Sequence, residues 1–242
     1  MRCPDTADWT KRQTGSMASS TRWADAPGTL AAVGASVALG LFYAAFQLHW
    51  LPVPLARIAG RLYFYPTLPL TYIARRKNYY TLVDSHVFLG AVPIAALGHV
   101  DQLHARGVRA VVNLCDEYAG PVEAYRKRGI QQLWLPTVDH TEPSLEDIRK
   151  AIDFISFHKD RGSRVYVHCK AGAGRSATIA FCWLLHAKET WNLSETQLYL
   201  SDRRKVRKTL GRQPNAIAYF ASLHPPPSPP LFPATPSTTQ QQ

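Results

Sequence analysis

The sequence predicts one α/β domain in which a central, mostly parallel sheet is flanked by helices. Strand-like runs alternate with helical patterns from residue 84 to residue 223, and this alternation is typical of a parallel sheet covered on both faces. The length of 242 residues and the 46% hydrophobic content fit one domain of ordinary size with appendages. An uncharged stretch from Ala26 to Ala56 adds an N-terminal apolar helix.

Each element follows from its residue pattern. Runs rich in β-branched and aromatic residues predict strands at 84–89, 109–114, 132–135 and 165–167. Apolar spacing, caps and glycine or proline boundaries predict helices at 93–106, 144–162 and 179–185, one opened by a capping box at Ser194, and one at 214–223. The basic and aromatic segment 61–70 is expected not to form a regular helix because it contains two prolines. It suits either a bilayer interface or a linker packed on the domain.

The chain divides into four segments. Residues 1–27 carry mixed charge without an apolar period and are expected to be a disordered leader and a candidate targeting segment, with Met17 as an alternative start. Residues 28–56 are an apolar membrane-anchor segment, either a bilayer span or a buried or interfacial helix. Residues 60–223 form the globular domain, and residues 224–242 form a Pro, Ser, Thr and Gln tail expected to be disordered.

Charge and cysteine usage limit the partners. The formal net charge of +11 favours acidic partners, namely phospholipid head groups, phosphorylated substrates or nucleic acid. Nucleic acid is not expected, because the sequence has no zinc-finger spacing and no basic run interleaved with aromatic residues. The cysteines lack the close pairs of a disulfide framework or a zinc site, so we expect no metal; they are Cys3, Cys115, Cys169 and Cys182.

The stretch from Val165 to Thr178 combines a strand, a glycine-spaced loop and a helix. In this geometry backbone N–H groups and a helix N-terminus converge on one point, which suits phosphate. Cys169 opens the loop and Arg175 closes it, so we expect the thiol to be largely thiolate at neutral pH. The arginine fork matches two phosphoryl oxygens. The predicted phosphate-binding residues are Lys170, Ala171, Gly172, Ala173, Gly174 and Arg175.

The pattern His168-Cys169, Gly172 and Arg175-Ser176 resembles the His-Cys-x-x-Gly-x-x-Arg-Ser/Thr signature of cysteine-dependent, dual-specificity-type phosphatases. The resemblance implies a protein-tyrosine-phosphatase-like domain over residues 60–223 and hydrolysis of a phosphate monoester through a phosphocysteine intermediate, without a cofactor. Ser176 is expected to donate a hydrogen bond to the sulfur, or alternatively to cap the helix. His168 is expected to orient the loop.

A phosphatase of this kind needs a proton donor for the departing alkoxide. The loop after the third strand offers Asp139 and Glu142, and Asp139 lies thirty positions before Cys169. We expect Asp139 to be the acid, because Glu142 is better placed for a role at a helix start. Asp116 and Glu117 follow the second strand and border the same sheet edge, where they either support Arg175 or remain solvated turn residues.

A wider resemblance covers roughly residues 60 to 223. The mitochondrial phosphatases that dephosphorylate phosphatidylglycerophosphate in cardiolipin synthesis have similar sequences at Phe64-Tyr65-Pro66-Thr67, at Phe88 to Pro93, at Glu117-Tyr118 and at Thr137-Val138-Asp139. This resemblance implies phosphatidylglycerophosphate as substrate and a position at the mitochondrial inner membrane facing the matrix. One departure is Ala173-Gly174, where many members carry Arg-Ser.

Other substrates stay open. Asn113-Leu114-Cys115 and the run from His168 to Gly172 also resemble tensin-type inositol-lipid phosphatases. A protein dual-specificity phosphatase would share the chemistry and differ in the pocket entrance, whereas a non-catalytic phosphate-binding module would not need the intact Cys169, Arg175 and Asp139. The expected partners are therefore a phospholipid or phosphoprotein substrate and a membrane surface.

Cys115 is a candidate redox partner for the nucleophile. It ends the strand 109–114, and Cys169 ends the nucleophile strand, so neighbouring parallel strands would bring the two sulfurs near each other. A nearby thiol can trap a sulfenic acid as a reversible disulfide, and the tensin-type resemblance implies the same pairing. The alternative is an inert buried thiol.

Overall fold

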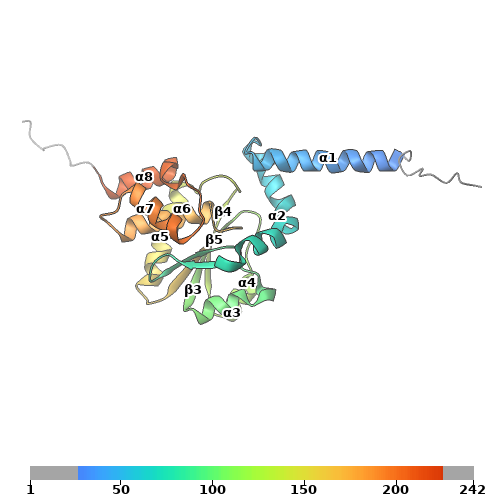
Figure 1. The fold of residues 1–242 in the computed structure, drawn as a ribbon. Helices are drawn as coiled ribbons and strands as arrows, with labels where there is room; N and C mark the ends of the chain where they lie inside the picture. The colour runs from blue at the N-terminus through green and yellow to red at the C-terminus, as the bar shows by residue number, and fades with distance from the viewer. Residues whose placement is uncertain (1–26, 226–242) are drawn as a thin grey trace, which may run out of the picture. The chain divides into compact units, whose positions relative to one another are not determined.

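A computed structural model describes residues 27–225 (Figure 1). The chain forms two compact units, which meet between Trp50 and Leu51 and are described separately. The predicted leader and tail lie almost wholly outside the described residues. The helices are α1 Pro27–Gln47, α2 Val53–Arg75, α3 His99–Ala105, α4 Val122–Lys127, α5 Leu145–Lys159, α6 Arg175–Ala187, α7 Leu193–Arg203 and α8 Pro214–Leu223. The strands are β1 Tyr80–Leu82, β2 Val87–Gly90, β3 Val108–Cys115, β4 Gln131–Thr137 and β5 Arg164–His168, and the 3₁₀ turns are η1 Arg76–Asn78, η2 Ala95–Leu97 and η3 Leu210–Arg212.

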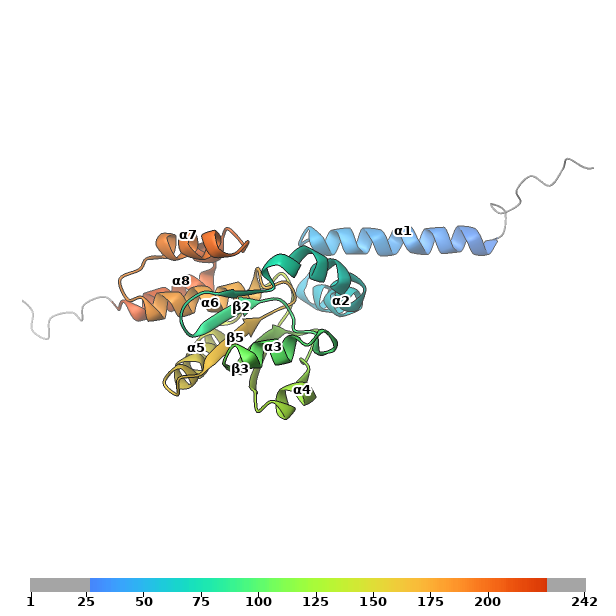
Figure 2. The ribbon, with the colours of Figure 1, turned by 60° about the horizontal axis from the view of Figure 1, so that its bottom comes forward.

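The second unit contains one five-stranded sheet of order β1-β2-β5-β3-β4. β1 is antiparallel to β2, and the other neighbours are parallel. Helices α5 and α6 cover one face, with α7 and α8 packed against them, while α3 and α4 cover the other face (Figure 2). The predicted α/β class and the mostly parallel sheet are therefore confirmed, and the carboxyl ends of four strands meet at one edge.

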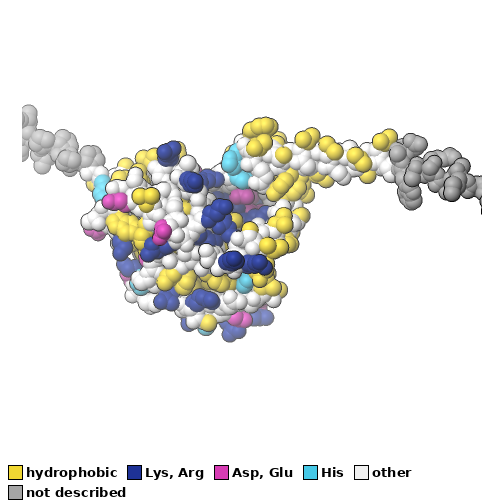
Figure 3. Space-filling view, in the orientation of Figure 1, with side chains coloured by type: hydrophobic (Ala, Val, Ile, Leu, Met, Phe, Trp, Pro, Cys, Tyr) yellow, Lys and Arg dark blue, Asp and Glu magenta, His cyan; other side chains and the backbone are white. Residues whose placement is uncertain are grey.

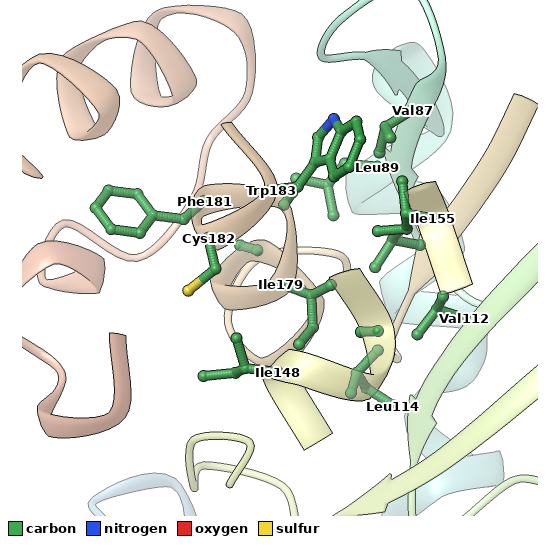
Figure 4. Packing of buried hydrophobic residues seen from close by; sticks show 14 of the residues in the cluster. Val87, Leu89, Val112, Leu114, Ile148, Ile155, Ile179, Phe181, Cys182 and Trp183 are labelled. Carbon is green, nitrogen blue, oxygen red and sulfur yellow. The ribbon is translucent and has the colours of Figure 1, made fainter. Parts of the chain in front are cut away.

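The core follows the two-residue period of the strands. On β5, Val165 and Val167 face the α5–α6 layer, whereas Tyr166 between them packs with α3 and α4. Figure 4 shows the larger cluster, in which Ile155 of α5 and Trp183 of α6 lie against strand residues such as Val87, Leu89 and Val112. This buried core fixes β5, and with it the loop that follows, in the middle of the sheet.

Several predicted boundaries move for local reasons. The strand expected at 84–89 is β2, because Asp84 accepts hydrogen bonds from the N–H groups of His86 and Val87 and holds a turn. The helix expected at 93–106 is split at Gly98, which has a φ of 69°. The short edge strand β1 was not predicted. The cap of α7 is Asn192, paired with Glu195 in a capping box, and not Ser194.

The prediction that residues 61–70 are not helical is wrong. They belong to α2, which contains Pro66 and Pro69. An interior proline costs about 3 kcal/mol, but Phe64 is fully buried in the main core and anchors the helix. Lys170, in the loop after β5, also donates to the carbonyl of Tyr63 at 3.3 Å and to the hydroxyl of Thr67 at 2.5 Å. Tertiary packing therefore outweighs the local signal.

The first unit contains α1. Residues 28–47 are long and apolar enough to cross a membrane. Its aliphatic side chains are exposed, for example Leu30 and Leu41 at 67% each. The predicted anchor at 28–56 is not one helix, because α1 ends at Gln47 and α2 begins at Val53.

Candidate active site

The loop between β5 and α6 has the backbone that the phosphate signature predicts. Gly172 has a φ of 66°, and a Cβ there would collide with the carbonyl of Gly90 and the guanidinium of Arg204. A side chain at this position is therefore excluded both by conformation and by space. Helix α6 begins at Arg175, directly after the loop.

The loop carbonyls are all held from outside the loop. The carbonyls of Lys170, Ala173 and Gly174 accept hydrogen bonds from the N–H groups of Val92, Arg207 and Thr178 at 3.1, 2.8 and 2.9 Å. Among the described residues, no protein acceptor takes a hydrogen bond from the loop N–H groups of residues 170–174. These N–H groups are therefore available to an anion, as in phosphate-binding nests.

Arg204 supports the loop from behind and was missed by the sequence analysis. Its guanidinium donates from Nε to the carbonyl of Gly172 at 2.7 Å and from Nη2 to that of Ala171 at 3.1 Å. It is 1% exposed and also binds the carbonyl of Asn78 at 2.5 Å. Arg204 lies 32 residues from Gly172, so no local pattern links it to the loop.

Cys169 is buried and favours the thiolate. Burial alone would raise its pKa, but the charge of Arg175 and hydrogen bonds from the hydroxyl and N–H of Ser176 outweigh this effect, so the pKa is lowered. The Ser176 hydroxyl donates to the Cys169 sulfur at 3.2 Å. The helix cap is Gly174, so the capping alternative for Ser176 is wrong.

Arg175 is 2% exposed and is clamped by carboxylates. Glu117 accepts two hydrogen bonds from it, at 2.8 and 2.7 Å, and Asp139 lies 3.0 Å from Nη2. The Thr137 carbonyl accepts a further hydrogen bond at 2.8 Å. Nε has no hydrogen-bond partner within the described part of the chain, so this buried donor can serve a phosphate oxygen.

The loop after β4 brings Asp139 to the site. Its pKa is lowered, because the attraction of Arg175 and His140 outweighs burial, which acts in the opposite direction. Glu142 does not reach the site; its carboxylate accepts a hydrogen bond from the N–H of Asn215 at the start of α8. Of the two candidate acids, the structure places only Asp139 beside Arg175.

Two further predicted site residues are His168 and Asp116, and only His168 lies where its predicted role requires. His168 is fully buried with a pKa lowered to about 3, mainly by burial, and its Nδ1 lies 3.3 Å from the Cys169 carbonyl. A neutral imidazole that donates to this carbonyl fits the predicted orienting role. Asp116 does not contact Arg175; it pairs instead with Arg57 and Arg61 of α2 at 3.4 and 3.3 Å.

Of the other predicted residues, Lys170 contacts helix α2 and Cys115 is buried in the sheet. The Lys170 ammonium donates to the carbonyl of Tyr63 at 3.3 Å and to the hydroxyl of Thr67 at 2.5 Å, both in α2. Cys115 is fully buried, and burial raises its pKa. The register pairs Asn113 of β3 with His168 of β5, so Cys115, the last residue of β3, and Cys169, the residue after β5, lie at the ends of adjacent strands. Within residues 27–225, no group of three or more His, Cys, Asp or Glu could hold a metal ion.

A loop cysteine poised as thiolate at the end of the central strand of this fold defines a cysteine-dependent phosphatase. Comparison with known protein families agrees with this class. The family model described as "Dual specificity phosphatase, catalytic domain" matches residues 87–216 of the sequence. The chain belongs to this family.

Individual relatives refine the comparison. The mouse phosphatidylglycerophosphatase and protein-tyrosine phosphatase 1 is 31% identical over 187 residues, which are 72% of this chain and 92% of the relative. The mouse dual specificity protein phosphatase 1 is 32% identical over 50% of this chain, but over 32% of its own length. A crystal structure of PTPMT1 in complex with PI(5)P is 26% identical and covers 60% of this chain and 97% of its own, with a TM-score of 0.53.

Proposed function

We propose that this phosphatase acts on a phospholipid, and that it converts phosphatidylglycerophosphate to phosphatidylglycerol. The observation that carries the proposal is the length of the similarity to the mouse phosphatidylglycerophosphatase, which extends over 92% of that protein and well beyond the catalytic-domain match. The similarity to the mouse dual specificity protein phosphatase 1 covers a third of that protein. The net charge of +11 is compatible with an anionic lipid substrate.

In the first step the Cys169 thiolate attacks phosphorus. A sulfur–phosphorus bond forms and the bond to the glycerol oxygen breaks. The N–H groups of the loop and the Arg175 Nε–H hold the charge on the equatorial oxygens. Glu117 fixes the orientation of the guanidinium through its two hydrogen bonds.

Asp139 protonates the departing alkoxide, and for this it must leave Arg175. In the substrate-free site its pKa is lowered, so the carboxylate is ionised and pairs with the guanidinium. A phosphate dianion in the loop competes for Arg175 and adds a negative charge beside Asp139. Both changes raise the pKa of Asp139 and favour the protonated form that an acid needs.

In the second step water attacks phosphocysteine. Asp139, now ionised, accepts the water proton, and the sulfur–phosphorus bond breaks to release inorganic phosphate. The Ser176 hydroxyl, 3.2 Å from the sulfur, stabilises the thiolate that departs.

The proposed location is the mitochondrial inner membrane, with the catalytic unit facing the matrix and residues 28–56 as the anchor. Helix α1 supplies the apolar length. Lys and Arg follow it in the sequence at 57, 61, 75, 76 and 77, and such residues favour the cytoplasm-like face.

Phosphate release by the full-length protein tests this function. We expect hydrolysis of phosphatidylglycerophosphate in mixed vesicles to exceed that of a phosphotyrosine peptide, with the Cys169→Ser variant as the blank. Preference for the peptide would establish a protein phosphatase. Preference for a phosphatidylinositol monophosphate would establish an inositol-lipid phosphatase, the candidate favoured by the ligand in the PTPMT1 complex.

A further inference from the structure

Helix α2 has an outer face that is apolar and uncovered. Its large hydrophobic side chains are between 42% and 65% exposed; they are Val53, Leu55, Ile58, Leu62, Tyr65, Leu70 and Ile73. Leu55, Ile58, Leu62, Tyr65 and Ile73 recur three, four or eight positions apart, so they follow one side of the helix. These five residues are called the outer face below. An apolar patch of this kind indicates an interaction surface.

The opposite side of α2 is already used by the catalytic unit. The side of α2 that packs on the catalytic unit is formed by its buried residues, Ala56, Ala59, Gly60 and Phe64. The outer face is therefore not needed for this packing. When a helix is buried on one side and apolar on the other, its second apolar side is also expected to pack against a nonpolar surface. Figure 3 shows hydrophobic side chains following the course of α2 along the edge of the unit.

The charged residues of α2 and of the turn η1 that follows it are all basic. No Asp or Glu occurs between Asp25 and Asp84, whereas Arg and Lys occur at 57, 61, 75, 76 and 77. Arg57 and Arg61 remain 51% and 60% exposed although they pair with Asp116. An apolar stripe flanked by cations fits the surface of an anionic bilayer, where each basic residue contributes about 1 kcal/mol.

The chain leads directly to such a surface. Helix α1 is long and apolar enough to span a membrane, and five residues separate its end at Gln47 from the start of α2 at Val53. Five extended residues reach at most about 18 Å. If α1 spans a bilayer, α2 begins within that distance of the lipid.

The inner side of α2 contacts the segments that build the active site. Lys170 of the phosphate loop binds the Tyr63 carbonyl and the Thr67 hydroxyl. Phe64 stacks on Tyr118, next to Glu117, with ring centroids 5.4 Å apart. Arg75 donates to the carbonyl of Lys205, beside Arg204, at 3.2 Å. Helix α2 therefore contacts the phosphate loop directly. It also contacts the residues next to Glu117 and Arg204, the two side chains that hold Arg175 and the loop carbonyls.

We propose that α2 lies in the surface of an anionic phospholipid bilayer, with its outer face among the lipids, and holds the phosphate loop at that surface. The head group of a substrate lipid then reaches Cys169 while its acyl chains stay in the membrane. This proposal rests on the proposed lipid phosphatase function for its catalytic consequence, although the insertion of α2 can be measured independently.

Photolabelling tests the insertion itself. The full-length protein is reconstituted in vesicles of phosphatidylcholine and phosphatidylglycerol that contain a diazirine-bearing phospholipid, and labelled residues are identified by mass spectrometry. We expect label on Leu55, Leu62 and Ile73 and none on Leu198, which is 72% exposed on α7. Absence of label from α2, or cross-links that join α2 of two copies, would overturn the proposal whatever the substrate is.

Kinetics test the consequence. The combined variant Leu55→Asp, Leu62→Asp and Ile73→Asp should lose about tenfold or more in activity on vesicle phosphatidylglycerophosphate. Its activity on soluble p-nitrophenyl phosphate should stay within about twofold. The matched control is Val122→Asp, Leu198→Asp and Ile217→Asp, at exposed positions of α4, α7 and α8, which should change neither activity.

The outcomes separate the two proposals. Equal losses on both substrates would assign the outer face to folding and overturn the docking role, as would full vesicle activity in the variant. A wild-type protein that hydrolyses p-nitrophenyl phosphate but no phospholipid would refute the lipid phosphatase function, while the photolabelling would still decide whether α2 enters the bilayer.

Discussion

Two buried arginines, one on each side of the phosphate loop, have opposite surroundings. Arg175, at the end of the loop, is held by the carboxylates of Asp139 and Glu117, which raise its pKa against the effect of burial. Arg204 lies behind the loop and binds neutral oxygens, the carbonyls of Ala171, Gly172 and Asn78 and a threonine hydroxyl. Burial lowers its pKa.

The difference separates two tasks. In the proposed mechanism a phosphate displaces Asp139 from Arg175 while Glu117 stays bound, so this arginine exchanges one anion for another. Arg204 has no carboxylate partner among the described residues, and its donors orient loop carbonyls outward so that the loop N–H groups remain free. One arginine binds the substrate in the proposed mechanism, and the other shapes the site that binds it.

The largest expected effect is the loss of turnover when the nucleophile Cys169 is replaced. Cys169→Ser should abolish turnover of p-nitrophenyl phosphate, a loss of about 10⁴-fold or more, because the hydroxyl is a far weaker nucleophile than a thiolate. Phosphate or vanadate binding, measured by calorimetry, should persist because the loop and Arg175 are unchanged. Near-normal turnover in this variant would contradict the assigned nucleophile.

Asp139→Asn is expected to cost about 10²–10⁴-fold on alkyl phosphates, since the leaving alkoxide loses its proton donor. The loss should be much smaller for p-nitrophenyl phosphate, whose acidic phenol leaves without protonation. The measurement is the ratio of kcat values for the two substrates in wild type and variant. Equal losses would show that Asp139 acts by holding Arg175 and not as an acid.

On the support side, Arg204→Met should reduce both stability and activity. The buried carbonyls of Ala171 and Gly172 lose their partner, at a cost of about 1–3 kcal/mol each in the free energy of unfolding. Arg212→Met is the matched control, because Arg212 is exposed and should change stability by about 0.5 kcal/mol or less. Urea unfolding and phosphate affinity are the readouts. An Arg204→Met protein that matches the control in both would show that the clamp is dispensable.

Ser176→Ala should move the acidic limb of the pH profile. The reactive form of Cys169 is the thiolate, and the hydrogen bond from Ser176 is one of the causes that lower its pKa. Its removal raises that pKa, so the acidic limb of kcat/KM should shift to higher pH. Iodoacetamide inactivation at each pH reports the same thiol without turnover. An unchanged limb would mean that Arg175 and the loop amides set the pKa without this hydroxyl.

The smallest change in basal activity is expected for Cys115→Ser. A sulfenic acid at Cys169 condenses with a neighbouring thiol to a disulfide and releases water, and added thiol reverses the bridge. Wild type treated with peroxide should therefore recover on reduction, and the variant should not. Peptide mass spectrometry should identify the Cys115–Cys169 link. Irreversible oxidation of Cys169 in both proteins would reject this redox pair.

The sequence was informative where the chemistry is local. The phosphate loop depends on residues within one short stretch, and its Gly172, Arg175 and Ser176 lie in the structure as that stretch predicts. Asp139 and Glu117 were found because parallel strands deliver their loops to one edge. Their relative geometry still needed the structure, which separates Glu117 from Asp116.

What the sequence did not predict depends on distant contacts. Arg204 supports the loop across 32 residues, and nothing in its own neighbourhood distinguishes it from Arg203. Helix α2 contains two prolines that argue against it locally, yet Phe64 in the core and the contacts of Lys170 with Tyr63 and Thr67 stabilise it. Both features depend on contacts with residues far away in the sequence, and a single sequence does not show which distant residues are in contact.

Trapping of the covalent intermediate tests the central claim most directly. The full-length protein is mixed with p-nitrophenyl phosphate and denatured within milliseconds, and its peptides are analysed by mass spectrometry. The proposed mechanism predicts one phosphoryl group on Cys169, formed in step with nitrophenol release and absent from Cys169→Ser. Turnover without a phosphorylated Cys169, or with the phosphoryl group on His168, would contradict it.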